Sequence, residues 1–193
     1  MTERNGIVCI IPARGGSKGI LNKIVVELEG RPLLSWSIVG AKASMCIERV
    51  IVSTDNGEIA AVARQWGAEV PFIRPEELAS DNVHAVQVVL HALKWLDQNE
   101  NYLPKGVMML LPTSPLRLTA DIDGAIDLFE SNNAPSVVSV VDLGKYMTNL
   151  RYIEDNRLVR VAPDEKPNAQ RQGLKKMFAV NGSIFLASPS NLK

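Results

Sequence analysis

The sequence is poor in the features that mark several specialised classes of protein. Its 193 residues include two cysteines, Cys9 and Cys46, which are too few and too far apart for a disulfide framework or a zinc knuckle. We expect both to be buried free thiols. The 21 basic residues balance the 21 acidic ones, so the chain lacks the positive charge of a general nucleic-acid-binding protein.

Long apolar runs are missing as well. Residues 107–111 are typical of the longest ones, and they fall far short of the ~20 residues that span a bilayer. The first five residues, Met-Thr-Glu-Arg-Asn, do not form the apolar stretch of a signal peptide. These absences predict a cytoplasmic protein with no membrane partner and no nucleic-acid partner.

What remains is the composition of an ordinary globular domain, with 46% apolar and 22% charged residues. One domain holds roughly 100–200 residues, so we expect residues 1–193 to form a single domain. Residues 142–180 stand apart within it, because they are polar and contain Pro163 and Pro167. Between Lys145 and Lys176 this stretch carries more basic than acidic side chains.

Apolar, β-rich runs alternate with helical patterns along most of the chain. The pattern predicts strands at 7–11, 50–53, 70–73, 107–111, 136–141 and 181–187, and helices that begin at Pro32, after Thr54-Asp55-Asn56-Gly57, at Ser80-Asp81 and at Thr119. Such alternation indicates an α/β fold with right-handed crossovers and a mostly parallel sheet covered by helices on both faces. Ligands of these folds bind beyond the carboxyl ends of the strands.

The segment from Pro12 to Gly19 directly follows the first expected strand. Its three glycines allow the backbone to turn N–H groups toward an anion, and Arg14, Lys18 and Lys23 add positive charge. The spacing fits neither a Walker A loop nor a dinucleotide-binding fingerprint. We interpret this segment as a phosphate-binding loop; the alternative is a flexible loop with solvated charges.

Five segments together resemble a known family. They are Ile11-Pro-Ala-Arg-Gly-Gly-Ser-Lys-Gly19, Val52-Ser-Thr-Asp55, Ile73-Arg-Pro-Glu-Glu-Leu-Ala-Ser-Asp81, Leu111-Pro-Thr-Ser-Pro-Leu-Arg117 and Asn181-Gly-Ser-Ile-Phe185. In this order they resemble the acylneuraminate cytidylyltransferases (CMP-sialic acid synthetases). The resemblance implies a Rossmann-like, three-layer α/β/α nucleotidyltransferase fold, that of the nucleotide-diphospho-sugar transferases, with a small dimerisation insert at residues 142–180.

The resemblance also implies an activity. The anomeric hydroxyl of a nine-carbon keto-sugar acid of the sialic acid type would attack the α-phosphate of CTP and give a CMP-sugar and pyrophosphate, with Mg²⁺ as cofactor. By the same resemblance the catalytic residues are Arg14, Lys18 and Lys23. The resemblance assigns nucleotide binding to Ala13, Gly15, Gly16, Ser17, Asn22, Arg74, Ser80 and Asp81. For the segment from Arg74 to Asp81 the alternative is a capping turn with a surface arginine.

The sugar acid should lie after the fourth expected strand. The resemblance assigns its binding to Thr113, Ser114, Arg117, Arg171 and Asn181. Arg171 belongs to the basic stretch that resembles the dimerisation insert of a homodimer, where it would serve the neighbouring subunit's site. The alternatives are a proline-bounded turn with a helix cap at residues 112–117, and a solvated loop for the insert.

The sequence departs from the family pattern in four places. An apolar Ile24 replaces a polar nucleotide contact, Asn82-Val83-His84-Ala85 replaces a turn rich in threonine and serine, and Leu111 replaces a sugar-binding glutamine. The family's magnesium-binding aspartates lie beyond the Asn-Gly strand, and the 193 residues do not reach them. Asp121 and Asp123 are better explained by the first turn of a helix, which favours acids. We therefore expect no metal ligands in this chain, which points to a fragment or to a diverged member.

Two alternatives to a sialic acid cytidylyltransferase follow from these departures. One is a non-catalytic or truncated dimer scaffold that binds nucleotides with the same fold. The other is the same reaction with a different base or sugar, such as an acid of the legionaminic or pseudaminic type. Base preference rests on hydrogen bonds near residues 74–85, where the sequence departs from the family pattern.

Overall fold

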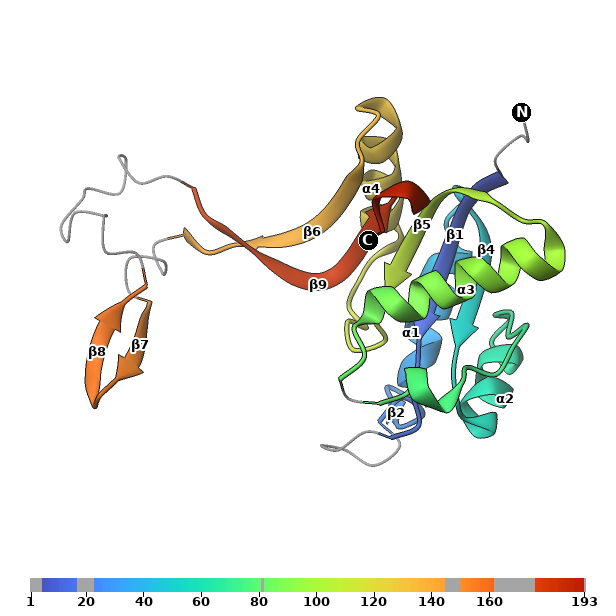
Figure 1. The fold of residues 1–193 in the computed structure, drawn as a ribbon, viewed down its shortest axis with the longest axis horizontal. Helices are drawn as coiled ribbons and strands as arrows, with labels where there is room; N and C mark the ends of the chain where they lie inside the picture. Colours follow the sequence, from blue (N-terminus) through green and yellow to red (C-terminus); the bar gives the residue numbers. More distant parts are fainter. Residues whose placement is uncertain (1–4, 17–22, 81, 145–149, 162–175, 193) are drawn as a thin grey trace. The chain divides into compact units, whose positions relative to one another are not determined.

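A computed structural model describes residues 5–16, 23–80, 82–144, 150–161 and 176–192 (Figure 1). The chain divides into two compact units. The first comprises Met1–Val138 and Gly182–Lys193, and the second comprises Ser139–Asn181. The boundaries of the second unit lie close to residues 142–180, the stretch that the sequence sets apart.

The first unit is built on a five-stranded sheet with the order β4-β1-β5-β9-β6. The strands are β1 (Asn5–Pro12), β4 (Ile47–Ser53), β5 (Pro104–Leu110), β6 (Ser136–Asp142) and β9 (Phe178–Ala187). β1 runs parallel to β4 and β5, and β9 runs antiparallel to β5. The buried apolar run in β1 is typical of a central parallel strand that has helices on both faces.

Helices cover both faces of this sheet, and alternate residues of β1 point toward different helices. Ile7 and Ile11 join one buried cluster with apolar residues of α1 (Leu33–Lys42), α2 (Gly57–Gln65) and α4 (Thr119–Ser131). Val8 and Ile10 join a second cluster with α3 (Ala85–Glu100), which crosses the other face in Figure 1. The chain therefore has the three-layer α/β/α architecture that the sequence predicts.

The strand expected at 70–73 does not form. Its place is taken by an isolated bridge between Ile51 and Glu69, in which the Glu69 N–H donates to Val50 O at 2.8 Å. Pro71 has no N–H and cannot continue a hydrogen-bonded ladder. The remaining short elements are β2 (Glu27–Leu28), β3 (Arg31–Pro32) and the 3₁₀ turns at Glu76–Leu78 and Pro189–Asn191.

Two helices have N-caps other than those expected, although α4 itself begins at Thr119 as expected. The N-cap of α3 is His84 rather than Ser80-Asp81, because the Val83 N–H closes a turn onto Ser80 O before the helix starts. The N-cap of α4 is Leu118 rather than Thr119. Its backbone N–H donates to the Asp121 carboxylate at 3.0 Å. That hydrogen bond gives Asp121 the capping role that its place in the first turn suggests.

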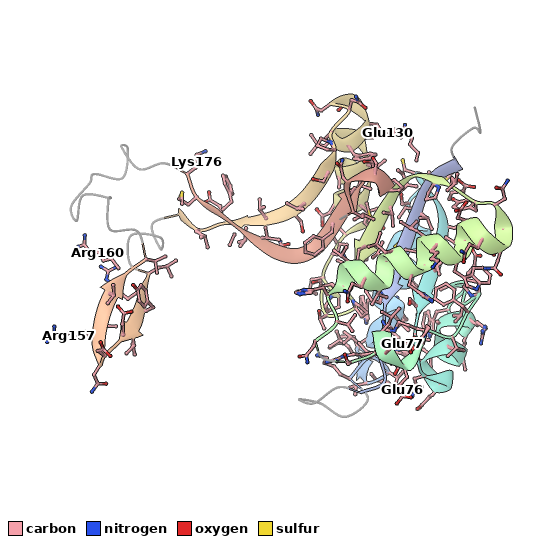
Figure 2. The ribbon with its side chains drawn as sticks, viewed as in Figure 1. Glu76, Glu77, Glu130, Arg157, Arg160 and Lys176 are labelled. Atoms are coloured by element: carbon pink, nitrogen blue, oxygen red, sulfur yellow. The ribbon has the colours of Figure 1, made fainter. Side chains whose placement is uncertain are left out.

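The second unit contains an antiparallel hairpin of β7 (Arg151–Glu154) and β8 (Arg157–Arg160). Asp155 and Asn156 form its two-residue turn, and both have positive φ, which two-residue hairpin turns favour. Arg157 and Arg160 lie on β8 (Figure 2). Exposed apolar side chains are frequent in this unit: Val140, Val141, Leu150, Tyr152, Ile153, Leu158, Val161, Phe178 and Val180.

The two cysteines differ in environment. Cys9 is buried in β1, and burial raises the pKa of its thiol to about 12. Cys46 is exposed, so the expectation of a buried thiol is wrong for this residue, which follows α1 in a loop. No helix in the described part of the chain is long and apolar enough to cross a membrane.

Gly106 is expected to be intolerant of a side chain. A Cβ atom there would lie 2.7 Å from Ile7 Cδ1 and 3.1 Å from Phe129 Cε1, inside the packed core. Gly106→Ala should therefore lower the free energy of unfolding by about 2 kcal/mol, measured by urea denaturation. Gly124→Ala in α4 is the matched control, because a Cβ there meets nothing within 4 Å. We expect no loss from the control, and equal stability of the two variants would contradict this prediction.

Candidate active site

A cavity of about 280 Å³ opens in the first unit at the carboxyl ends of β1 and β5. It is lined by Pro12, Arg14, Ile24, Arg74, Leu78, Ser80, Val83, Ala85, Val88, Leu111, Pro112 and Thr113. This edge of a parallel sheet is where α/β proteins bind their ligands. Four residues assigned from the sequence, Arg14, Arg74, Ser80 and Thr113, are thus brought together around one cavity.

The described part of the phosphate-binding loop, residues 12–16, is called the glycine loop below. It is hydrogen-bonded to the end of the neighbouring strand β4. The buried Ala13 donates its N–H to Ser53 O at 2.9 Å, and Gly15 donates its N–H to Asp55 Oδ1 at 3.1 Å. The Gly15 N–H is therefore aimed at a carboxylate and not into the cavity. Gly16 is exposed, and the side chain of Arg14 reaches the cavity wall.

Arg74 is buried, with 4% of its surface exposed, so the alternative of a surface arginine is wrong. Its N–H donates to Thr54 O at 2.8 Å, and its Nη2 lies 3.3 Å from Asp55 Oδ1. Burial lowers the pKa of the guanidinium, and the charge of Asp55 opposes this effect. Its buried Nε has no hydrogen-bond partner among the described residues, which is unusual for a buried polar atom.

The turn after β5 carries Thr113 and Ser114. Thr113 is exposed and lines the cavity, and the Ser114 N–H closes a turn onto Leu111 O at 3.2 Å. Thr113 also borders a second, largely apolar cavity of about 300 Å³, which Lys23 lines as well. The two cavities therefore adjoin at Thr113, and Lys23 lines the second of them.

Arg117 connects three elements of the fold. Its Nε donates to Ser183 O at 2.8 Å, its Nη1 to Ser37 Oγ at 3.2 Å and its Nη2 to Leu111 O at 3.0 Å. Burial lowers the pKa of this guanidinium. The contacts join α1, the end of β5 and β9, so they give Arg117 a structural task. Its assignment to sugar binding stays a prediction.

Several assigned residues cannot be placed around the cavity. Ser17, Lys18, Asn22, Asp81 and Arg171 lie outside the described residues. Asn181 belongs to the second unit, where its Oδ1 accepts a hydrogen bond from Ser139 Oγ at 2.6 Å. The roles of these six residues stay predictions.

Sequence reasoning missed two features of the site. The first is Asp55, which lies within a family-like segment but received no role. The second is the apolar wall of the cavity, which Leu78, Val83 and Val88 form together with Ile24 and Leu111. The only sequence signal for this wall was the replacement of polar family residues at positions 24 and 111.

Acidic side chains do not form a metal centre in the described part of the chain, where no three His, Cys, Asp or Glu residues are grouped to hold an ion. Asp121 caps α4, and Asp123 accepts a hydrogen bond from Ser44 Oγ at 2.5 Å. The described residues therefore do not form a closed set of protein ligands for Mg²⁺, which usually binds one or two carboxylates together with phosphates and water.

Solved nucleotidyltransferases share the three-layer α/β/α fold of this chain. The fold is similar to CMP:2-keto-3-deoxy-manno-octonic acid synthetase solved with CTP, with a TM-score of 0.73 at 14% identity, over 97% of this chain and 76% of that one. It is also similar to 4-diphosphocytidyl-2C-methyl-D-erythritol synthase from Anaerococcus prevotii, with a TM-score of 0.63 at 14% identity, over 95% of this chain and 71% of that one.

The sequence model of the cytidylyltransferase family matches residues 8–179, and the chain belongs to this family. It is 34% identical to the CMP-N,N'-diacetyllegionaminic acid synthase of Legionella pneumophila, over 96% of this chain and 79% of the relative. It is also 34% identical to the N-acylneuraminate cytidylyltransferase of Escherichia coli, over 96% of this chain. The chain spans 43% of that relative's length. The pseudaminic acid cytidylyltransferase of Campylobacter jejuni is 30% identical over 94% of this chain and 78% of its own length.

Proposed function

We propose that this chain carries the CTP-binding and sugar-acid-binding domain of a CMP-sugar-acid synthetase. The substrate would be a nine-carbon keto-sugar acid of the sialic, legionaminic or pseudaminic type. The observation that carries the proposal is the family match, together with relatives whose names specify these three acids. The cytoplasm stays the predicted location.

In the proposed reaction the anomeric hydroxyl of the sugar acid attacks the α-phosphorus of CTP. A new phosphorus–oxygen bond forms, the bond to the β-phosphate breaks, pyrophosphate leaves and the hydroxyl proton passes to the surrounding water. Such a transfer depends mainly on positioning and on neutralising negative charge. Arg14, Lys18 and Lys23 would supply the positive charge that neutralises it. Arg74 and Ser80 would lie on the cytosine side of the cavity.

The apolar wall of the cavity favours a sugar acid with apolar substituents. Leu111 cannot form the hydrogen bonds of an amide, so hydroxyl groups placed against it would lose partners. The acetamido groups of a diacetylated acid present methyl groups that suit such a wall. We therefore place an acid of the legionaminic or pseudaminic type ahead of sialic acid itself.

The test is release of pyrophosphate from CTP and Mg²⁺ with a panel of N-acetylneuraminic, legionaminic, pseudaminic and 3-deoxy-octulosonic acids. Release with one acid, abolished in Lys18→Ala, would establish the reaction and its substrate. Mg²⁺ enters the assay because the family resemblance implies it. A rise in melting temperature with CTP but no release would favour a nucleotide-binding scaffold. No response to CTP of either kind would overturn the proposal.

We also propose that the second unit, residues 139–181, pairs with a second copy of the chain. Ile153 and Leu158 face each other across the hairpin, and they are 74% and 73% exposed. Apolar side chains gathered on so small a unit are typical of an interface between subunits. We expect light scattering after gel filtration to report a dimer at micromolar concentration and a monomer for Ile153→Glu combined with Leu158→Glu. A monomeric parent chain would contradict the proposal.

A further inference from the structure

A carboxylate lies where the site should be positively charged. Asp55 lies two residues after the end of β4 and is only partly exposed, next to the glycine loop and Arg74. A negative charge here repels the phosphates of a nucleotide, and it weakens the attraction that Arg14 and the lysines provide. We therefore look for the role of Asp55 in the groups that donate hydrogen bonds to its carboxylate.

One oxygen of Asp55 accepts hydrogen bonds from both the glycine loop and Arg74. Asp55 Oδ1 lies 3.1 Å from the Gly15 N and 3.3 Å from Arg74 Nη2. Hydrogen bonds to an ionised acceptor are stronger than those between neutral groups, and a guanidinium–carboxylate pair is stronger still. The same atom thus fixes the glycine loop and the buried arginine relative to each other.

The backbone carbonyls of the two residues before Asp55 accept hydrogen bonds from the same two segments. Ser53 O accepts from the Ala13 N–H, and Thr54 O accepts from the Arg74 N–H. The backbone contacts hold the two segments against the end of β4, but they do not orient the Arg74 side chain. Asp55 accepts a hydrogen bond from that guanidinium, whose Nε has no partner among the described residues.

We propose that Asp55 is a positioning residue that couples the phosphate-binding loop to Arg74, so that one CTP molecule contacts both at the correct spacing. This inference rests on the proposed function. It also assigns the Gly15 N–H to Asp55 rather than to a phosphate, which leaves Arg14 and the residues after Gly15 to bind the triphosphate.

The experiment is a double-mutant cycle on CTP affinity, measured by calorimetry with Asp55→Ala, Arg74→Ala and the combined variant. We expect each single variant to weaken CTP binding about tenfold and the combined variant about 20-fold, because residues that act together are not additive. Asp55→Asn keeps an acceptor oxygen and should lose only about threefold. Asp97→Ala, which removes an exposed carboxylate from α3, is the matched control and should bind CTP as the parent chain does.

The affinity for inorganic triphosphate distinguishes the contact of Asp55 with the glycine loop from its contact with Arg74. Asp55→Ala should weaken triphosphate binding because the glycine loop loses its anchor, whereas Arg74→Ala should leave triphosphate binding unchanged. Additive losses, about 100-fold in the combined variant, would overturn the coupling. So would a lower melting temperature with CTP affinity intact, which is the result of a purely structural role. If the parent chain binds no CTP, the proposed function fails as well, and this outcome is distinct from additive losses in a chain that binds.

Discussion

Replacing Arg117 with methionine is expected to lower the free energy of unfolding by about 3 kcal/mol. The guanidinium donates to backbone carbonyls of Ser183 and Leu111 and to Ser37 Oγ. Methionine fills much of the volume but removes the guanidinium donors from these acceptors, of which Ser37 is buried; Leu111 O keeps the Ser114 N–H. The free energy of unfolding, measured by denaturant titration, checks this result.

Two further variants make the Arg117 prediction specific. Arg117→Lys should recover little, because one ammonium group cannot reach acceptors that a planar guanidinium reaches in different directions. Arg31→Met is the control, since the Arg31 guanidinium stacks on Trp36 at 3.4 Å. Such a contact contributes about 0.5–1 kcal/mol near the surface. Equal losses for Arg117→Met and Arg31→Met would show that Arg117 does not join the three elements.

The sequence was sufficient for the layers of the fold but not for all strand pairing. The apolar run at 7–11 predicts a buried parallel strand, and β1 is one, because a strand between two helical layers has no polar face. Residues 70–73 have a similar composition, yet the pairing there ends after one bridge. Pairing depends on the partner strand and on Pro71, neither of which the apolar pattern reports.

The site was predictable where charge and glycine gather in one segment, and less so where partners lie far apart. Arg14 and the loop around Gly15 were identified from composition alone. The burial of Arg74 was not, because its partner Asp55 lies 19 residues away in sequence. The sequence did not indicate the structural contacts of Arg117 either, since two of its four acceptors are backbone carbonyls, which carry no signature in the sequence.

Gly15→Ala is expected to weaken CTP binding about tenfold, a free-energy change of about 1.4 kcal/mol. A Cβ atom on Gly15 would lie 2.9 Å from Asn56 Nδ2 and 3.1 Å from Asn56 Cβ. The loop must then move away from the end of β4, which breaks the hydrogen bond from the Gly15 N–H to Asp55. Asn56 has little freedom to move instead, because its side chain caps α2 by accepting from the Glu58 and Ile59 N–H groups.

Gly16→Ala is the matched control for this effect, because a Cβ there meets nothing within 4 Å and neither glycine has a positive φ. Both substitutions add one methyl group to the same loop, so a difference between them isolates the contact with Asn56 and Asp55. Titration calorimetry with CTP should give a clearly smaller loss of affinity for Gly16→Ala than for Gly15→Ala, because only Gly15 lies against Asn56. If the two variants bind CTP equally, the loop does not depend on its attachment to β4. If only Gly15→Ala is weakened, the position of the loop against the strand end controls binding, because its charges are the same in both variants.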